Sequence, residues 1–314
     1  MPTTVFASTL SKSVAVPVFF MITGFFYNIE ENKEKKQIIK LLKLILFASI
    51  LYFVWNIMIG CAKYIVKGNP DYIFAAFRAF DINNILQMIF LNTSPFAEHL
   101  WYLNAIVYVL ICSYILKKVK LFKVLYWLTP VLLVADLVFG KYSVAIFGQA
   151  FDYIYVRNFL FVGIPYFTIG IAIRDIWKKQ LINKYKIYKY LLVISVVVFV
   201  ILCTVERYTI LTLGINAPRD HYIFTTPLAC SVFLLFLEMF PKENKKLNLI
   251  SDIGKNNSLD IYVIHPIIIV VLGAIAKILH LGTLYLYVAP LLVFAVSIIS
   301  STIYRKLLSY FTSK

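Results

Sequence analysis

The sequence predicts an all-α membrane protein, a polytopic bundle of about nine transmembrane helices, and three observations support this fold class. Of the 314 residues, 61% are hydrophobic and 15% are charged, and the mean hydropathy of +0.83 is far above that of water-soluble domains. Apolar segments follow one another from end to end, without a polar block long enough to build a second core. Lys and Arg residues cluster between these segments. We therefore expect residues 1–314 to form a single membrane domain.

The nine expected helices follow from the lengths of the apolar runs. About 17 to 25 mostly apolar residues cross the hydrocarbon layer as a helix. The segments that meet this condition are Ser13–Ile29, Ile38–Gly60, Leu100–Leu116, Leu121–Gly140, Asn158–Ile173, Tyr190–Val205, Tyr222–Phe240, Leu259–Leu279 and Leu284–Tyr304. The run Ile82–Leu91 is too short to span, so we expect it to be interfacial or re-entrant.

The positions of the basic residues orient the expected helices. Most of the 31 Lys and Arg residues lie in alternate connections and at the C-terminus, and connections rich in these residues face the cytoplasm. The C-terminus is therefore expected in the cytoplasm and residues 1–12 outside, where Lys12 would have to cross the membrane without a signal peptide before it. This predicts that one more helix precedes Met1 in the complete protein and that the present chain is N-terminally truncated.

The sequence argues against several function classes. The net charge of +16 does not indicate nucleic-acid binding, because the basic residues lie in short connections between apolar runs. The chain has no GxxxxGK[ST] or GxGxxG phosphate loop, no HExxH motif, no GxSxG elbow and no HxxxxD dyad. Its His and Cys residues lack the spacing of zinc ligands, so we expect no metal.

Ionisable residues inside the apolar segments are few, and each is a candidate for function. Asp136 and Glu238 fall near helix ends, where interfacial water reaches them. Asp260 falls in the first turn of a helix, which favours an acidic residue. His265 lies about eight residues, or roughly 12 Å, into the same helix and precedes Pro266. His265 and Asp260 lie on different faces of the helix, and each is either structural or part of a proton relay.

The outer connections carry more reactive side chains. Glu98, His99, Trp101 and Tyr102 open one expected helix, Arg157 and Asn158 open another, and Glu206, Arg207, Arg219, Asp220 and His221 lie in a third connection. Together they could line one external cleft suited to general acid/base chemistry on a polar acceptor. The alternative is an aromatic belt with solvated interfacial charges, as in most membrane proteins.

Three motifs occur in order along nearly the whole chain. Val14–Phe26 contains VPVFFMITG, His99–Leu103 reads HLWYL, and Ile253–Pro266 contains GKNNSLDIYVIHP. These segments resemble the VPxFFxxSG, HLWYL and GxxSLxIYxxHP motifs of the acyltransferase family 3 membrane proteins. Within that family, Arg157–Pro165 and Gly214–Phe224 are most similar to the membrane domain of the vancomycin-resistance serine racemases.

The resemblance implies a membrane O-acyltransferase of the bacterial cell envelope. It would move an acyl group, usually acetyl, from cytoplasmic acyl-CoA to a hydroxyl of an envelope glycan or a lipid-linked sugar. The expected catalytic residues are His99 as the base, Glu98 and Arg157, and the expected acceptor-binding residues are Trp101, Tyr102, Arg207, Arg219 and His221. The expected donor is acetyl-CoA, the expected partners are membrane lipid and the acceptor, and the expected location is the bacterial plasma membrane. The family typically has ten helices, the first carrying an essential histidine to which no residue of this chain corresponds.

Two other functions stay open. A transporter or binding protein for a small amino acid such as serine is proposed for the racemase-linked relatives, and transporters often contain broken helices near the midplane. The chain has Pro17 and Pro130 in its first half and Pro165, Pro227 and Pro266 in its second, but no paired repeat. The third possibility is a non-catalytic homologue.

Overall fold

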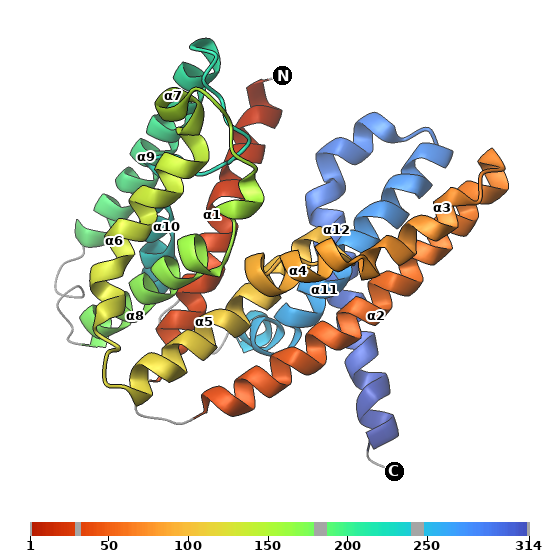
Figure 1. The fold of residues 1–314 in the computed structure, drawn as a ribbon, viewed down its shortest axis with the longest axis horizontal. Helices are drawn as coiled ribbons and strands as arrows, with labels where there is room; N and C mark the ends of the chain where they lie inside the picture. Colours follow the sequence, from red (N-terminus) through yellow and green to blue (C-terminus); the bar gives the residue numbers. More distant parts are fainter. Residues whose placement is uncertain (1, 29–32, 179–186, 240–247, 313–314) are drawn as a thin grey trace. The chain divides into compact units, whose positions relative to one another are not determined.

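The computed structural model describes residues 2–28, 33–178, 187–239 and 248–312, and the regular structure within these ranges is entirely helical (Figure 1). The chain divides into two compact units, Met1–Met239 and Phe240–Lys314. An all-α polytopic bundle is therefore confirmed as the fold class.

The first unit contains most of the helices. Its α-helices are α1 (Pro2–Phe26), α2 (Glu34–Lys67), α3 (Asp71–Phe74), α4 (Ile82–Leu91), α5 (Trp101–Lys118), α6 (Val124–Asp136), α7 (Ser143–Phe147), α8 (Ile164–Lys178), α9 (Ile187–Thr212) and α10 (Thr225–Met239). Short 3₁₀ helices are η1 (Ala75–Phe80), η2 (Glu98–Leu100) and η4 (Tyr153–Tyr155), and π-helices are η3 (Leu137–Lys141) and η5 (Phe159–Gly163).

Helix occupies most of each of the nine predicted segments, and the described residues that are not helical lie at the segment ends, at 27–28, 121–123, 158, 222–224 and 279. Among the described residues, seven helices are long and apolar enough to cross a membrane. The other two predicted spans correspond to shorter apolar helices, Val14–Phe26 and Thr225–Met239. The predicted ends at Ile29 and Phe240 lie outside the described residues.

Close packing of α1 on α8 forms the centre of the first unit. A Cβ atom at Gly24 would lie 1.9 Å from the carbonyl oxygen of Phe167, and one at Gly170 would lie 2.1 Å from that of Met21. Only glycine fits at such a backbone contact, and small residues serve the same purpose in other membrane helices. Phe20, Met21 and Phe167 are fully buried around it.

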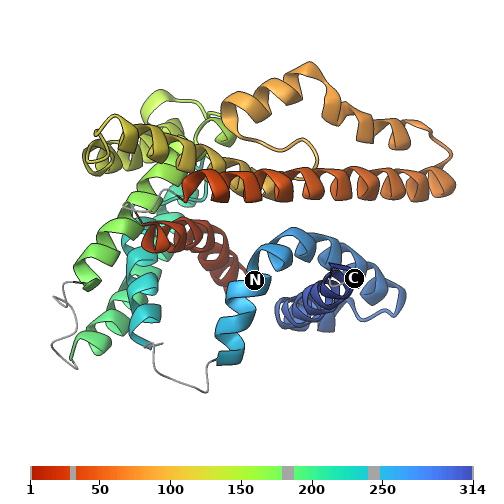
Figure 2. The ribbon, with the colours of Figure 1, turned by 90° about the horizontal axis from the view of Figure 1, so that it is seen from below.

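The segment α3–η1–α4 lies along the second half of α2 (Figure 2). Gly60 of α2 allows the approach, because a Cβ there would lie 2.4 Å from the carbonyl oxygen of Tyr72. The run Ile82–Leu91, which we expected to be interfacial or re-entrant, forms the helix α4, and Asp71–Phe80 before it was not predicted to be helical. The two pieces meet at a bend of 46°, and together they are long and apolar enough for a broken span or a re-entrant loop.

The second unit is a hairpin of α11 (Asn248–Ile278) and α12 (Gly282–Thr312). The turn uses His280 with a positive φ of 56°. Asn257 Nδ2 donates to Thr302 Oγ1 at 3.2 Å, and Arg305 Nε donates to Asp260 Oδ2 at 2.5 Å. These contacts join the two helices away from the turn.

Candidate functional site

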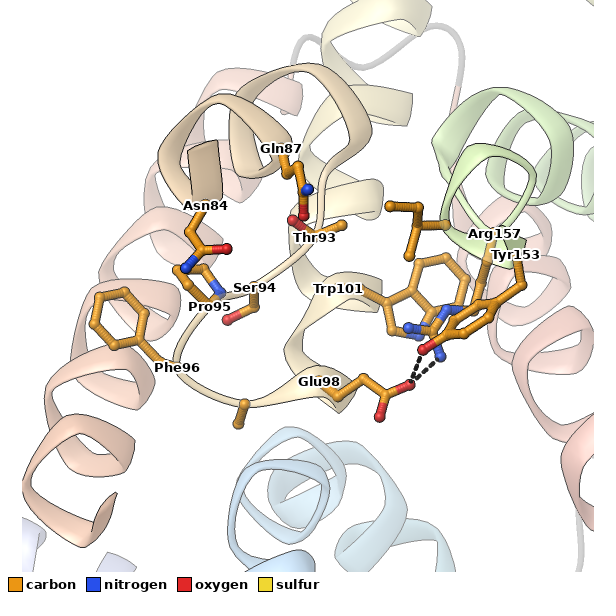
Figure 3. A pocket seen from close by; sticks show the side chains of 12 residues that line it. Asn84, Gln87, Thr93, Ser94, Pro95, Phe96, Glu98, Trp101, Tyr153 and Arg157 are labelled. Carbon is orange, nitrogen blue, oxygen red and sulfur yellow. Dashed lines mark hydrogen bonds and ion pairs between the residues drawn. The ribbon is translucent and has the colours of Figure 1, made fainter. Parts of the chain in front are cut away.

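A cavity of about 340 Å³ lies in the first unit, within the usual size range of small-molecule sites (Figure 3). Four pieces of chain form it: α4, the following loop, the start of α5 and the loop before η5. Its lining residues are Asn84, Gln87, Thr93, Ser94, Pro95, Phe96, Ala97, Glu98, Trp101, Tyr153, Ile154 and Arg157. We call this cavity the α4 pocket.

An ion pair crosses one side of the α4 pocket. Arg157 Nη1 donates to Glu98 Oε1 at 2.7 Å, and the hydroxyl of Tyr153 donates to the same oxygen at 3.0 Å (Figure 3). The guanidinium also stacks over the rings of Tyr153 and Trp101, at 4.4 and 5.3 Å from the ring centres. The sequence grouped Glu98, Trp101 and Arg157 in one cleft, and the structure brings these three together.

Protonation of Tyr153 is fixed by its surroundings. Burial raises the pKa of its hydroxyl, and the hydrogen bond to Glu98 raises it further, although the nearby charge of Arg157 acts in the opposite direction. The hydroxyl therefore stays protonated at neutral pH and acts as a donor to Glu98.

Two asparagines hold the loops that carry this ion pair. The fully buried Asn92 accepts a hydrogen bond from the Phe159 amide at 2.8 Å. Asn158 accepts from the Leu160 and Phe161 amides at 2.9 and 3.1 Å, which caps the following helix. Position 92 adopts a φ of 50°, a conformation that asparagine tolerates better than most residues. These bonds fix the position of Arg157 relative to α5.

Other pocket side chains are available to a ligand. Gln87 and Ser94 make no side-chain hydrogen bond to the residues that the structure describes, although both line the pocket. Asn84 uses its amide nitrogen to bind the carbonyl of Arg78 at 2.7 Å, which leaves its oxygen available. The pocket thus offers amide, hydroxyl and carboxylate groups, a set suited to binding hydroxyl groups.

Two predicted site residues do not line the pocket. The ring of His99 packs edge-on against Tyr52 of α2, at 5.0 Å between ring centres. The ring of Tyr102 is buried against Phe19 and Phe20, at 5.8 and 4.8 Å. Adjacent residues of a helix face different directions, so the HLWYL segment divides between the pocket and the core.

A second charged cluster is buried elsewhere in the first unit. Arg219 Nε donates to Asp136 Oδ1 at 3.1 Å, and His221 Nδ1 lies 2.6 Å from Asp136 Oδ2. The side chains of Asp136 and Arg219 are only 2% and 8% exposed. The sequence predicted that Asp136 would lie near water and did not associate it with Arg219 and His221, so the solvated interpretation of Asp136 is wrong.

The cluster holds His221 in one chemical form. Nδ1 of His221 lies 2.6 Å from Asp136 Oδ2 and 2.9 Å from Arg219 Nη2. A carboxylate can only accept, so the shorter contact favours the tautomer in which Nδ1 carries the proton and donates it to Asp136. Burial lowers the pKa of His221, and Arg219 lowers it further, against the opposing effect of Asp136. His221 is therefore neutral at pH 7, and Asp136 and Arg219 balance each other's charge.

The buried cluster lies directly behind the loop that carries Arg157. A Cβ at Gly140 in the π-helix η3 would lie 3.0 Å from Arg219 Cγ and 3.6 Å from Val156 Cγ2. Val156 is buried on this side, while Arg157, the next residue, lines the pocket. Lys141, also in η3, donates to Asn216 and to the carbonyl of Ala217 at 2.7 and 3.0 Å. The cluster therefore supports one wall of the α4 pocket.

The remaining predicted residues lie apart from the pocket lining. Arg207 is half-buried on α9 beside Glu206, which accepts hydrogen bonds from Tyr142 and the Ile223 amide. In the second unit, Asp260 binds Arg305, and His265 Nδ1 lies 2.9 Å from the carbonyl of Tyr262 in its own helix. Within the described part of the chain, His, Cys, Asp and Glu side chains form no group of three that could hold a metal ion.

Comparisons with known proteins agree with the sequence motifs. The family model of an acyltransferase domain matches residues 2–305. An amino-acid racemase from Enterococcus faecalis is 26% identical over 290 residues, which cover 84% of this chain and 36% of the relative. The chain thus spans about a third of that relative's length. No solved structure matches the chain.

Proposed function

The chain belongs to this acyltransferase family of multi-pass membrane proteins, and we propose that it is an O-acyltransferase of the bacterial plasma membrane with its C-terminus in the cytoplasm. The proposed reaction moves an acetyl group from cytoplasmic acetyl-CoA to a hydroxyl of an envelope glycan or a lipid-linked sugar. The α4 pocket is the proposed acceptor site.

The hydrogen-bonding groups of the α4 pocket carry this proposal. Gln87, Ser94 and Glu98 present an amide, a hydroxyl and a carboxylate around one cavity, which suits the hydroxyl groups of a neutral sugar. The guanidinium of Arg157 is already neutralised by Glu98. The cavity therefore presents no isolated charge that would require an ionic acceptor.

The proposed chemistry assigns different roles to adjacent residues. A neighbouring hydroxyl of the acceptor donates a hydrogen bond to Glu98, which orients the sugar. His99, next in the chain, removes the proton of the reacting hydroxyl, which has to extend beyond the pocket lining toward the ring of His99 beside Tyr52. The hydroxyl oxygen then bonds to the thioester carbonyl carbon, the carbon–sulfur bond breaks, and coenzyme A leaves as a thiol with the transferred proton. The proposed role of Arg157 is to stabilise the negative charge that develops on the carbonyl oxygen.

A basic end of the first unit is the proposed entry for the donor. Glu34 binds Lys117 and the hydroxyl of Tyr27, and Arg174 binds the carbonyl of Tyr27. These contacts join the ends of α1, α2, α5 and α8. Exposed lysines surround them, namely Lys35, Lys36, Lys118, Lys120, Lys123 and Lys178. Such a cluster attracts the phosphates of coenzyme A.

Acetyl-CoA turnover tests the enzyme directly. The purified chain in lipid nanodiscs should release free thiol from acetyl-CoA when an envelope extract is added, and His99→Ala should lose this release. Deletion of the gene should lower acetylation of the envelope. If thiol release is absent and acetylation is unchanged after deletion, the enzyme proposal fails.

A small-amino-acid binding function is the second candidate. It is favoured by the opposite charges of Glu98 and Arg157 in one cavity, which match the ammonium and carboxylate groups of an amino acid, and by the racemase name of the relative. Saturable binding or uptake of labelled serine by proteoliposomes, without thiol release from acetyl-CoA, would select this candidate.

A further inference from the structure

Hydrogen bonds hold the end of α4 in place, and this end forms part of the α4 pocket. The structure describes all ten residues of α4, and none of them is buried. No fully buried apolar side chain of α4 therefore fixes its position. Gln87 on α4 and Thr93 just after it line the pocket, so the bonds that hold this end also set the width of the pocket.

Two side chains of α5 bind the backbone at the end of α4. Asn104 Nδ2 donates to the carbonyl oxygen of Thr93 at 2.7 Å, and the hydroxyl of Tyr108 donates to that of Ile89 at 2.7 Å. Asn104 and Tyr108 are four positions apart, so they lie on the same face of α5. Helix ends leave such carbonyl groups without intrahelical partners, and here α5 supplies the partners.

Asn92, the first residue after α4, joins three walls of the pocket. Its backbone N–H donates to the carbonyl of Gln87. Its side-chain Nδ2 donates to the carbonyl of Trp101 at 3.4 Å, and its Oδ1 accepts from the Phe159 amide at 2.8 Å. Gln87 and Trp101 line the pocket, and Phe159 lies two positions after Arg157. One residue thus connects α4, α5 and the loop that carries Arg157.

Few residue types meet the requirements of position 92. The backbone has a φ of 50° and the side chain is fully buried, and asparagine and glycine adopt this conformation more readily than most residues. The side chain must also donate on one side and accept on the other, which an amide can do and a carboxylate cannot. Asparagine is the residue that satisfies the backbone and both bonds.

We infer that Asn92 is a positioning residue of the proposed acceptor site, because it holds Arg157 over the ring of Trp101. This inference rests on the proposed function and adds to it a residue that does not line the pocket. Without the side-chain bonds of Asn92, the loop that carries Arg157 would shift relative to α5. The acceptor would then lose the fixed arrangement of groups that binds it.

Transfer of labelled acetyl from acetyl-CoA to hexadecyl glucoside, by the full chain in nanodiscs, tests the inference. Asn92→Gly keeps the positive φ and removes both side-chain bonds. The KM for hexadecyl glucoside should rise about fivefold or more, while the KM for acetyl-CoA should stay within about twofold of the wild type. A variant that merely contained less folded enzyme would lower the rate and change neither KM.

Thr168→Val is the matched control. Thr168 is also buried in the first unit, and its hydroxyl donates to the carbonyl of Ile164 at 2.8 Å, but it does not line the pocket. The control therefore loses a buried bond from a side chain to the backbone, as Asn92→Gly does. Both KM values should match those of the wild type.

A double-mutant cycle shows whether Asn92 acts through Arg157. In the background of Arg157→Gln, the guanidinium that Asn92 holds is already absent. Asn92→Gly should then change the KM for hexadecyl glucoside by less than about twofold. Independent effects would instead add, as they do for sites that are not coupled.

Hydrogen exchange follows the bond from Asn92 without reference to activity. The Phe159 amide should exchange about tenfold faster in Asn92→Gly than in the wild type. The Leu160 and Phe161 amides, which donate to Asn158, are the internal reference and should exchange as in the wild type.

A second variant covers the case in which Asn92→Gly does not fold, as judged by its melting curve. Asn92→Asp keeps an acceptor oxygen for the Phe159 amide and loses the donor to Trp101. The Phe159 amide should keep most of its protection, and the KM for hexadecyl glucoside should lie between those of the wild type and Asn92→Gly. If only Asn92→Asp folds, its KM should still exceed that of the wild type.

Each contrary result has its own meaning. If the wild type transfers acetyl and the folded Asn92 variants keep its KM for hexadecyl glucoside, the inference fails and the proposed function stands. An equal effect of Asn92→Gly with and without Arg157 would also overturn the inference and assign Asn92 to the fold alone. Unchanged exchange of the Phe159 amide in Asn92→Gly would overturn it as well. Absence of transfer by the wild type would overturn the proposed function itself.

Discussion

Two Arg–carboxylate pairs in the first unit have the same chemistry and opposite surroundings. Glu98 and Arg157 border the α4 pocket, with side chains 68% and 20% exposed. Asp136 and Arg219 are buried together with His221. An exposed pair contributes about 0–1 kcal/mol to stability, whereas loss of one partner from a buried pair costs about 3–5 kcal/mol. Burial thus separates a pair available to a ligand from one that holds the fold.

The largest expected effect is on stability, at the buried pair. Asp136→Asn leaves the charge of Arg219 buried without a counter-charge, so we expect the unfolding free energy to fall by about 3–5 kcal/mol. Thermal unfolding of purified protein in detergent measures the effect. Asp152→Asn is the control, because Asp152 is exposed. A melting temperature equal to that of the wild type would show that the buried pair does not stabilise the unit.

The next effect is on activity, at the pocket pair. Arg157→Gln removes a charge-assisted hydrogen bond and a stacked cation, so kcat/KM for the acceptor should fall about tenfold, equivalent to about 1.4 kcal/mol. Stability should change by less than about 1 kcal/mol. Arg157→Lys keeps the charge but lacks the planar guanidinium, so its kcat/KM should lie between those of the wild type and Arg157→Gln. Transfer of labelled acetyl measures the loss of activity, and thermal unfolding measures the change in stability. Loss of stability without loss of transfer would assign Arg157 to the fold.

A smaller effect is expected from pH. The pKa of His221 is lowered in the folded protein by burial and by Arg219, so His221 takes up a proton on unfolding. Stability should therefore fall as the pH drops below about 6.5, by about 1.4 kcal/mol for each unit by which the pKa is lowered. His221→Gln should flatten this part of the curve. Melting temperatures from about pH 8 to about pH 5 provide the measurement. An unchanged slope in the variant would assign the pH response to another group.

The smallest effect is expected in the second unit. Asp260 pairs with Arg305, whose side chain is 43% exposed, so Asp260→Asn should cost about 0–1 kcal/mol. Acceptor transfer should stay at the wild-type rate, because Asp260 serves a helix contact in this account. A rate loss in Asp260→Asn without loss of stability would instead support the proton-relay interpretation.

Composition and spacing predicted the helices well, because apolar runs of membrane length have few other folds available. The grouping of Glu98 with Arg157 was also predicted, since both open helices expected on the same side. The predicted single cleft is divided between the α4 pocket and the buried cluster. The sequence does not show how the loops pack on one another. It therefore could not show that Arg157 lines the pocket while Arg219 belongs to the buried cluster.

Two details depended on tertiary packing, and a third was missed because of its local sequence pattern. Asp136 meets His221 across 85 positions, a contact that no local pattern encodes. Asn92 caps a distant backbone amide, although the Asn-Thr-Ser-Pro run after α4 does indicate a turn. The helical turns Asp71–Phe80 were missed because charged residues interrupt their apolar pattern.

Transfer of labelled acetyl from acetyl-CoA to hexadecyl glucoside in nanodiscs tests the central claim, that the α4 pocket is the acceptor site of a membrane acyltransferase. Wild type and Asp260→Asn should form labelled glucoside, and Glu98→Gln should form about tenfold less while keeping the wild-type melting temperature. Equal product from Glu98→Gln and the wild type, or none from the wild type, would contradict the claim.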